Sequence, residues 1–116
     1  MTKKQTVAYL SGPITGVKDY EERFAEAYAK AINDPRIDAV ISPIDIGSVL
    51  ECDREKAGLD SPKWRDFVIE DITVMMRCDV VVMLPDWIHS SGARIERGLA
   101  QQLSIKVWEL SHLRTA

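Results

Sequence analysis

The six residues "DVVVML" (79–84) form a continuous apolar run after an opening aspartate. A strand with one exposed face alternates apolar and polar side chains, whereas a strand covered on both faces is apolar throughout. We therefore expect a central strand of a parallel sheet here. The loop "PDWIHSSG" (85–92) follows this run, and a helix is expected from Ser90 or Ser91 to about Leu103.

Further strands and a first helix precede or follow this central run. The helix is expected from about Asp19 to Ile32, because its apolar residues are spaced three or four apart. Asp19 and Glu22 are predicted to cap its start. Apolar, β-branched runs predict three more strands, at 6–10, 38–42 and 105–110.

The middle of the chain carries another helix and a long connection. A helix is expected over 62–77, with Ser61 as its cap and Pro62 in its first turn. Residues 43–61 predict a connection with one short helix near 46–50. Connections of this length inside a domain often form functional lids or binding loops.

The order of strands and helices predicts a single domain, residues 1–116, whose parallel strands are joined by right-handed crossovers. The expected fold class is α/β, a three-layer sandwich around a flavodoxin-like or Rossmann-like parallel sheet of four or five strands. Ligands of such sheets bind beyond the carboxyl ends of the strands, near the switch in strand order. This rule selects three segments, "SGPITG" (11–16), "PID" (43–45) and 85–92.

Composition and charge exclude several classes of partner. The chain has a net charge of -3 and no cluster of lysine or arginine, so we expect no nucleic-acid polymer as a partner. Cys52 and Cys78 lack the spacing of a metal set, and we expect no metal or other cofactor. No run approaches the roughly 20 apolar residues of a membrane span. The start "MTKKQT" does not resemble a signal peptide, so we expect a cytoplasmic protein.

Two carboxylates, Asp71 and Glu96, fall on helix faces that should be buried. An ionised carboxylate is costly on a packed face unless it has a partner. Near the carboxyl ends of parallel strands, two such groups can serve as nucleophile and acid/base. The alternatives are a structural carboxylate at Asp71 and a buried salt bridge from Glu96 to Arg94 or Arg97.

The three selected segments also supply candidate ligand contacts. Ser90 and Ser91 can cap the last helix or bind an anion together with its backbone N–H groups, and Gly92 allows a ligand to approach closely. Trp87 can stack on a base or anchor its loop, and Tyr9 can line the site or pack in the core. The remaining candidates are Ser11, Gly12, Ile14, Thr15, Gly16, Pro43 and Asp45.

The motifs together resemble the nucleoside 2-deoxyribosyltransferase superfamily. The resemblance covers about residues 7–107 and is closest to a short branch of uncharacterised proteins, many of them from phages and prophages. It implies that Glu96 attacks the anomeric carbon of a nucleoside, that Asp71 acts on the base, and that Tyr9 orients the nucleophile. The matching motifs are "YLSGPITG" (9–16), Trp64 with Asp71, "CDVVVMLPDW" (78–87) and "SSGARIERGLA" (90–100).

The resemblance also implies a substrate and an assembly. Transferases of the superfamily carry an aspartate six residues before the nucleophile, whereas Ser90 at this position is similar to the nucleotide N-hydrolases, whose substrates carry a 5′-phosphate. A hydroxyl at a helix N-terminus favours a phosphate, which an aspartate would repel. Arg94 is a further candidate phosphate ligand. In several members a neighbouring subunit completes the pocket, and homo-oligomers are expected here, although "SHLRTA" (111–116) has no counterpart of the residue involved.

Three hypotheses follow from these observations. The leading one is an enzyme of nucleotide metabolism that cleaves the N-glycosidic bond of a (deoxy)nucleoside 5′-monophosphate, by hydrolysis rather than base transfer. The second is a non-catalytic module that binds a nucleotide or nucleotide-sugar. The third is an assembly unit that pairs through the uncovered strand 105–110, with Trp108 exposed at the interface.

Overall fold

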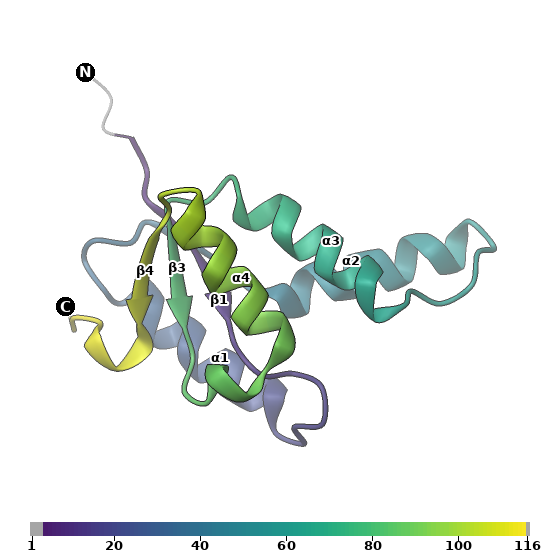
Figure 1. Ribbon diagram of the computed structural model, residues 1–116, viewed down its shortest axis with the longest axis horizontal. Helices are drawn as coiled ribbons and strands as arrows, with labels where there is room; N and C mark the ends of the chain where they lie inside the picture. The colour runs from purple at the N-terminus through teal and green to yellow at the C-terminus, as the bar shows by residue number, and fades with distance from the viewer. Residues whose placement is uncertain (1–3, 116) are drawn as a thin grey trace.

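The four predicted strands form one sheet in the order β2-β1-β3-β4, and every neighbouring pair is parallel (Figure 1). The computed structural model describes residues 4–115. The α/β fold class is confirmed, with a flavodoxin-like or Rossmann-like sheet of four strands. The strands are β1 (Val7–Ser11), β2 (Ala39–Ile41), β3 (Val80–Met83) and β4 (Lys106–Glu109). The helices are α1 (Tyr20–Ile32), α2 (Pro43–Lys56), α3 (Trp64–Met75) and α4 (Ser91–Gln102), with 3-10 turns η1 (Trp87–His89) and η2 (Leu110–His112).

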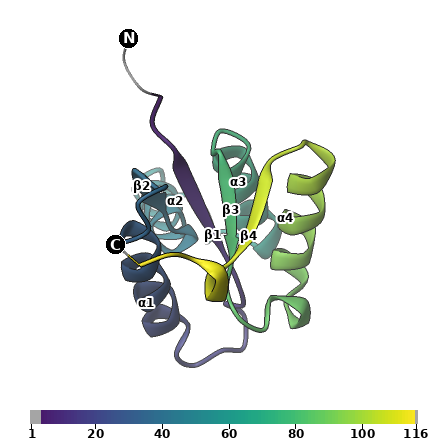
Figure 2. The same ribbon diagram turned by 90° about the vertical axis from the view of Figure 1, so that its left-hand side faces the viewer.

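β3 lies inside the sheet, and all four of its residues are buried, as its continuous apolar sequence predicts. Its side chains alternate between two cores. Val82 packs with Phe24 of α1 on one face, and Val81 packs with Met75 of α3 and Ala100 of α4 on the other. Figure 2 shows α1 and α4 on opposite sides of the sheet. Each buried valine stabilises the fold by about 1.5–3 kcal/mol, so neither face tolerates a polar residue.

The segment between β2 and α3 differs most from the prediction. Residues 43–56 form the continuous helix α2, where a loop with a short helix near 46–50 was expected. Ser42 caps this helix, because its hydroxyl accepts a hydrogen bond from the N–H of Ile44 (3.3 Å). Gly47 does not break it. A Cβ at Gly47 would lie 3.4 Å from the ring of Phe67, so this glycine lets α2 and α3 pack closely.

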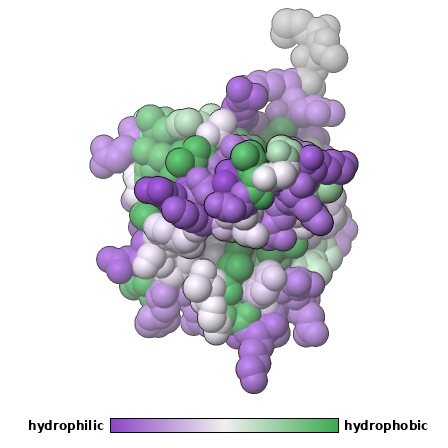
Figure 3. Space-filling view, turned by 90° about the vertical axis from the view of Figure 1, so that its right-hand side faces the viewer, coloured by the Kyte–Doolittle hydropathy of each residue, from purple (hydrophilic) through white to green (hydrophobic). Residues whose placement is uncertain are grey.

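α2 and α3, with the turn 57–63 between them, form an arm that projects from the sheet (Figure 1). Hydrophilic residues cover its tip, and apolar residues show on the surface beside it (Figure 3). Only Pro43 of α2 and Met75 of α3 are buried. The arm therefore contributes little to the two cores.

The predicted side-chain caps of the helices were correct in one case and wrong in two. Ser90 caps α4, accepting a hydrogen bond from the N–H of Ala93 (3.2 Å). Asp19 does not cap α1, and its carboxylate instead pairs with Arg23 one turn later (3.0 Å). α3 begins two residues after Pro62, with Lys63 rather than Ser61 in the N-cap position. Asp66 in its first turn accepts a hydrogen bond from the N–H of Lys63 (2.8 Å).

The edge strand β4 is less open than expected. Trp108 is half-buried, because the guanidinium of Arg36 lies 4.1 Å from its ring centroid and the indole packs against the α1 core. Asp34 is 1% exposed and accepts hydrogen bonds from Arg36 and from the N–H of Arg114 (2.7 Å), which ties the segment after β4 to the end of α1. None of the helices in residues 4–115 is long and apolar enough to cross a membrane.

Candidate active site

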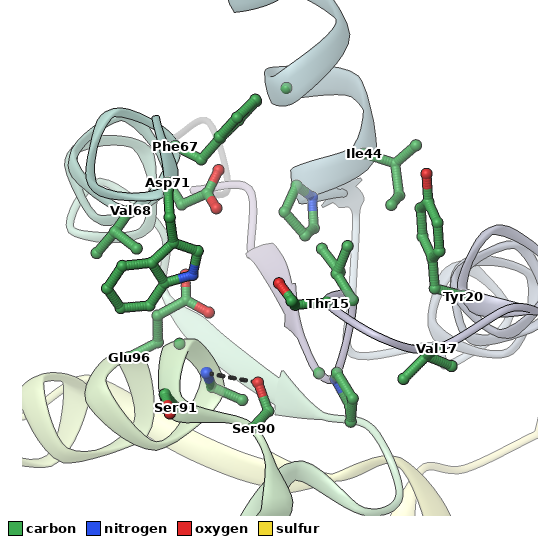
Figure 4. Close-up of a pocket in the computed structure, with 18 of the residues that line it drawn as sticks. Thr15, Val17, Tyr20, Ile44, Phe67, Val68, Asp71, Ser90, Ser91 and Glu96 are labelled. Atoms are coloured by element: carbon green, nitrogen blue, oxygen red, sulfur yellow. Dashed lines mark hydrogen bonds between the residues drawn. The ribbon is translucent and has the colours of Figure 1, made fainter. Parts of the chain in front are cut away.

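A cavity of about 1300 Å³ opens beyond the carboxyl ends of β1, β2 and β3, where the sheet rule places a ligand. Its walls are the loop after β1, the first turns of α1, α2 and α3, and the η1–α4 segment. Figure 4 shows Asp71 of α3 and Glu96 of α4 on one side of this cavity and Tyr20 of α1 on the other. Segments far apart in the sequence thus meet at one site.

Glu96 lies at the bottom of the site and is 7% exposed. The hydroxyl of Tyr9 donates a hydrogen bond to its Oε2 (2.5 Å), and the hydroxyl of Ser11 donates one to its Oε1 (2.8 Å). Burial raises the pKa of Glu96, and the two hydrogen bonds oppose that rise. Burial and the neighbouring carboxylate raise the pKa of Tyr9 well above its ordinary value, so the phenol remains a proton donor.

The alternative of a buried salt bridge at Glu96 is wrong. No arginine lies within ion-pair distance of Glu96 in residues 4–115. Arg97 instead stacks on Trp87, with its guanidinium carbon 4.4 Å from the ring centroid. Arg94 is exposed and does not line the cavity, because two residues along a helix from Glu96 place it on a different face.

Asp71 lines the cavity beside Glu96 and is partly buried. Its Oδ1 has no hydrogen-bond partner, and the carboxylate forms no salt bridge within the described part of the chain. A role as a structural carboxylate paired with an arginine is therefore wrong. Burial first, then the charges of Glu96 and Glu70, raise the pKa of Asp71 to about 7. Near neutral pH one carboxyl of this pair can thus donate a proton while the other remains ionised.

The structure brings together most of the predicted ligand contacts. Residues from all three selected segments line the cavity: Gly12, Ile14, Thr15, Pro43, Ser90, Ser91 and Gly92. Gly12 also has a structural role, since a Cβ there would lie 2.7 Å from the Cβ of Leu84. Gly92 has open space around it, as its predicted role requires.

Other predicted contacts lie outside the cavity lining. Tyr9 and Ser11 lie behind Glu96 and reach the site through their hydrogen bonds to it. Gly16 sits in a turn with φ of 78°, and Asp45 is exposed on the outer side of α2. Trp87 packs against the core on the α4 side of the sheet, so it anchors its loop.

Aromatic residues of the walls were not predicted as site residues. Trp64, Phe67 and Tyr20 all line the cavity, and Trp64 is 51% exposed. Trp64 and Phe67 belong to the apolar stripe of α3, which also carries Asp71 two turns after Trp64. The signal that could have found them was this spacing, because residues seven apart share a helix face. Arg23 was also missed, and it lies 3.7 Å from Asp86 at the same cavity.

No group of three or more metal-ligating side chains occurs in residues 4–115. The site is thus defined by two carboxyl groups, two buried hydroxyls, the start of α4 and aromatic walls. Fold and site together define a parallel α/β domain with a carboxylate pair at the carboxyl ends of its strands. Within this class, the chain belongs to the family DUF4406, described as a domain of unknown function, which matches residues 6–109. No curated protein matches the chain.

Proposed function

We propose that the chain is an enzyme that hydrolyses the N-glycosidic bond of a (deoxy)nucleoside 5′-monophosphate. The observation that carries this proposal is the buried Glu96, held by two hydroxyls and placed beside the unpartnered Asp71 in one cavity. The resemblance to nucleoside 2-deoxyribosyltransferases gives this pair the roles of nucleophile and acid/base. The family match leaves the activity open.

In the proposed reaction, protonated Asp71 donates its proton to a nitrogen of the base. The bond between the anomeric carbon and the base breaks, and its electron pair leaves with the base. The carboxylate of Glu96 bonds to the anomeric carbon or stabilises its positive charge, as in retaining glycosidases. Water then attacks this carbon, Asp71 accepts the proton of the water, and Glu96 is released as a carboxylate.

The cavity has distinct regions for the parts of such a substrate. The hydroxyls of Ser90 and Ser91 and the first turn of α4 favour the 5′-phosphate, because a helix N-terminus offers N–H groups and a positive dipole end. Trp64 and Phe67 offer aromatic surface on which a base can stack. The loop 12–15 lines the same cavity, and we assign it to the sugar.

The carboxylates at the cavity favour a second candidate substrate, the nucleoside without its phosphate. Glu21, Glu51 and Asp86 also line the cavity, and their negative charges disfavour a phosphate. The catalytic roles are the same for both candidates. The substrate panel therefore pairs each nucleoside monophosphate with its nucleoside.

The test is to incubate the purified protein with this panel and to measure the free base by chromatography. We expect base release by the unmodified chain and a loss of at least about a hundredfold in Glu96→Gln, since catalytic nucleophiles and acid/base groups contribute at least that much. Both proteins should unfold cooperatively in urea. Equal base release by the two would contradict the proposed chemistry. Thermal stabilisation by a nucleotide without any base release would favour the non-catalytic binding module.

A further inference from the structure

We propose that Ser11 is a second positioning residue for Glu96, whose carboxylate it orients and keeps ionised together with Tyr9. The inference rests on the proposed function of Glu96 as nucleophile. Ser11 is 0% exposed and does not line the cavity, so its hydroxyl does not reach substrate directly. Its hydroxyl instead donates to Glu96 Oε1, across 85 residues of sequence.

The sheet itself fixes the position of the Ser11 hydroxyl. Ser11 ends β1 and pairs with Met83 of β3, and its carbonyl accepts a hydrogen bond from the N–H of Leu84 (2.8 Å). Tyr9 and Ser11 are two residues apart on one strand, so their side chains point to the same face. The two donors therefore come from one rigid element, which holds them more precisely than a loop would.

The two donors bind different oxygens of the same carboxylate. Tyr9 binds Oε2 and Ser11 binds Oε1. The terminal torsion of a glutamate side chain is broad and two-fold when nothing restrains it. One hydrogen bond leaves the second oxygen free to move, whereas two hydrogen bonds fix the plane of the carboxylate. Tyr9 alone would therefore hold Glu96 less well than the pair does.

Ser11 also stabilises the charged form of Glu96. The titratable groups that face Glu96 are Tyr9 from β1 and Asp71 from α3, with Glu70 next to Asp71. β3, the strand beside β1, carries no titratable side chain. Burial favours the protonated form of Glu96, and the hydrogen bonds from Tyr9 and Ser11 lower its pKa against this effect.

The test is a pH titration of the Glu96 carboxyl carbon by ¹³C NMR, with Glu96→Gln identifying its signal. In Ser11→Ala we expect the titration midpoint of Glu96 to rise by about one pH unit, because one stabilising donor is lost. Ser11→Cys, with a weaker donor, should give an intermediate midpoint. An unchanged midpoint in folded Ser11→Ala would overturn the proposal.

Ser42→Ala is the matched control. Ser42 is also buried, directly follows β2 and caps α2, but its hydroxyl accepts a hydrogen bond from the N–H of Ile44 and does not contact Glu96. Its loss should lower stability without moving the titration of Glu96. An equal shift of the Glu96 midpoint in both variants would assign the effect to loosened packing and would overturn a specific role for Ser11.

Enzyme kinetics separate this inference from the proposed function. In Ser11→Ala the acid limb of the kcat/KM profile should move up in pH with the NMR midpoint, while KM on the plateau stays unchanged because Ser11 does not line the cavity. At pH values below that limb, a shift of about one unit lowers kcat/KM about tenfold. If the unmodified chain releases no base, the proposed function fails while the NMR titration still decides the role of Ser11. Base release with an unshifted limb in Ser11→Ala would overturn the inference alone.

Discussion

Asp71 and Glu96 are the same kind of group in two different surroundings. Glu96 is held by two hydroxyl donors, whereas Oδ1 of Asp71 has no partner. The pKa of Asp71 is raised to about 7, first by burial and then by the charge of Glu96. Surroundings that separate the proton affinities of two carboxyl groups also separate their roles.

The first prediction concerns the pH dependence of base release. Asp71 must be protonated to donate to the base, so kcat/KM should fall as pH rises through about 7, the pKa of this carboxyl. At acid pH kcat/KM should fall again as Glu96 becomes protonated. Because the pKa of Glu96 is raised, this fall should occur at a higher pH than for an ordinary glutamate. The measurement is kcat/KM between pH 4 and 9. A rate that rises steadily to pH 9 would rule out Asp71 as the acid.

The second prediction is that Asp71→Asn stabilises the fold in a pH-dependent way. The folded pKa of about 7 lies above the unfolded pKa of 3.8, so ionisation favours the unfolded chain between these values. Asparagine cannot ionise. Its gain in the free energy of unfolding over the unmodified chain should therefore be small near pH 4, grow up to about pH 7 and then level off.

Urea unfolding of both proteins at pH 4, 6 and 8 measures this gain. Glu55→Gln is a suitable comparison, because Glu55 is exposed on α2 and lies outside the cavity. It should change the free energy of unfolding by less than about 0.5 kcal/mol, as exposed substitutions do. A gain in Asp71→Asn that is equal at all three pH values would refute the linkage to Asp71.

At the scale of elements, the loop after β1 is fixed to the loop after β3 through a glycine. A Cβ at Gly12 would lie 2.7 Å from Cβ of Leu84, while nothing lies within 4 Å of a Cβ at Gly92. Both glycines line the cavity. Only the first is needed for close packing of the chain.

The third prediction compares these two glycines. Gly12→Ala should lower the free energy of unfolding by about 1–3 kcal/mol, the usual cost of inserting a methyl group into packed surroundings. Gly92→Ala should leave it unchanged or raise it by up to about 1 kcal/mol, because alanine favours a helix. Thermal unfolding of both variants checks this. Similar stabilities of the two would contradict the packing role of Gly12.

The elements that the sequence predicted well are those whose cause lies in their own residues. The continuous run of β3 and the serine that caps α4 needed no distant partner to be recognised. α2 was not predicted at its full length because most of its residues are exposed, so its sequence shows no clear apolar face, and because it contains Gly47. Gly47 packs close to the ring of Phe67, which lies 20 positions later in the sequence.

In the candidate site too, features that depend on local sequence were predicted, and features that depend on distant residues were not. Asp71 and Glu96 stood out because each is a charged residue on an apolar helix face. Arg94, a predicted phosphate ligand, is exposed and lies outside the cavity lining, because it is two residues from Glu96 along α4. The hydrogen bond between Ser11 and Glu96 was not predicted, because strand register and helix rotation must both be known to place two groups 2.8 Å apart.

At the scale of the whole molecule, Asp34 connects the end of α1 with the segment after β4. Its buried carboxylate accepts hydrogen bonds from the side chain of Arg36 (2.6 Å) and from the N–H of Arg114 (2.7 Å). The hydrogen bond from Arg36 lowers the pKa of Asp34 far below its ordinary value. The ionised form of Asp34 thus stabilises the fold.

The fourth prediction is that Asp34→Asn lowers the free energy of unfolding by about 3 kcal/mol at pH 7, because it leaves a paired arginine without its anion. The folded pKa lies below the unfolded one, so this stabilisation is complete above the unfolded value of 3.8 and decreases as pH falls below it. Urea unfolding at pH 7 and pH 3 tests both parts. Asp38→Asn is the control, since exposed Asp38 accepts one hydrogen bond, from the N–H of Thr6. Equal losses in the two variants would contradict the role of Asp34.

The fifth prediction is self-association, which stays an expectation from the sequence. Several large apolar side chains are exposed on one pair of helices and just beyond them: Ile69 and Met76 at α3, and Ile95 and Leu103 at α4. Exposed apolar surface of this kind is typical of protein contacts. Light scattering coupled to size-exclusion chromatography should show a homo-oligomer. A strict monomer at high concentration would contradict it.

The arm has a consequence for how such a domain can diverge. It supplies Trp64 and Phe67 to the cavity, yet buries only Pro43 and Met75 of its two helices. The length of the arm and the residues at its exposed positions can therefore change at little cost to the stability of the fold. The carboxylate pair keeps one member on α4, which is anchored on the sheet, and its hydroxyl partners are fixed on β1. Under the proposed function, changes at exposed positions of the arm would alter which base is accepted, as long as Asp71 of α3 keeps its place beside Glu96.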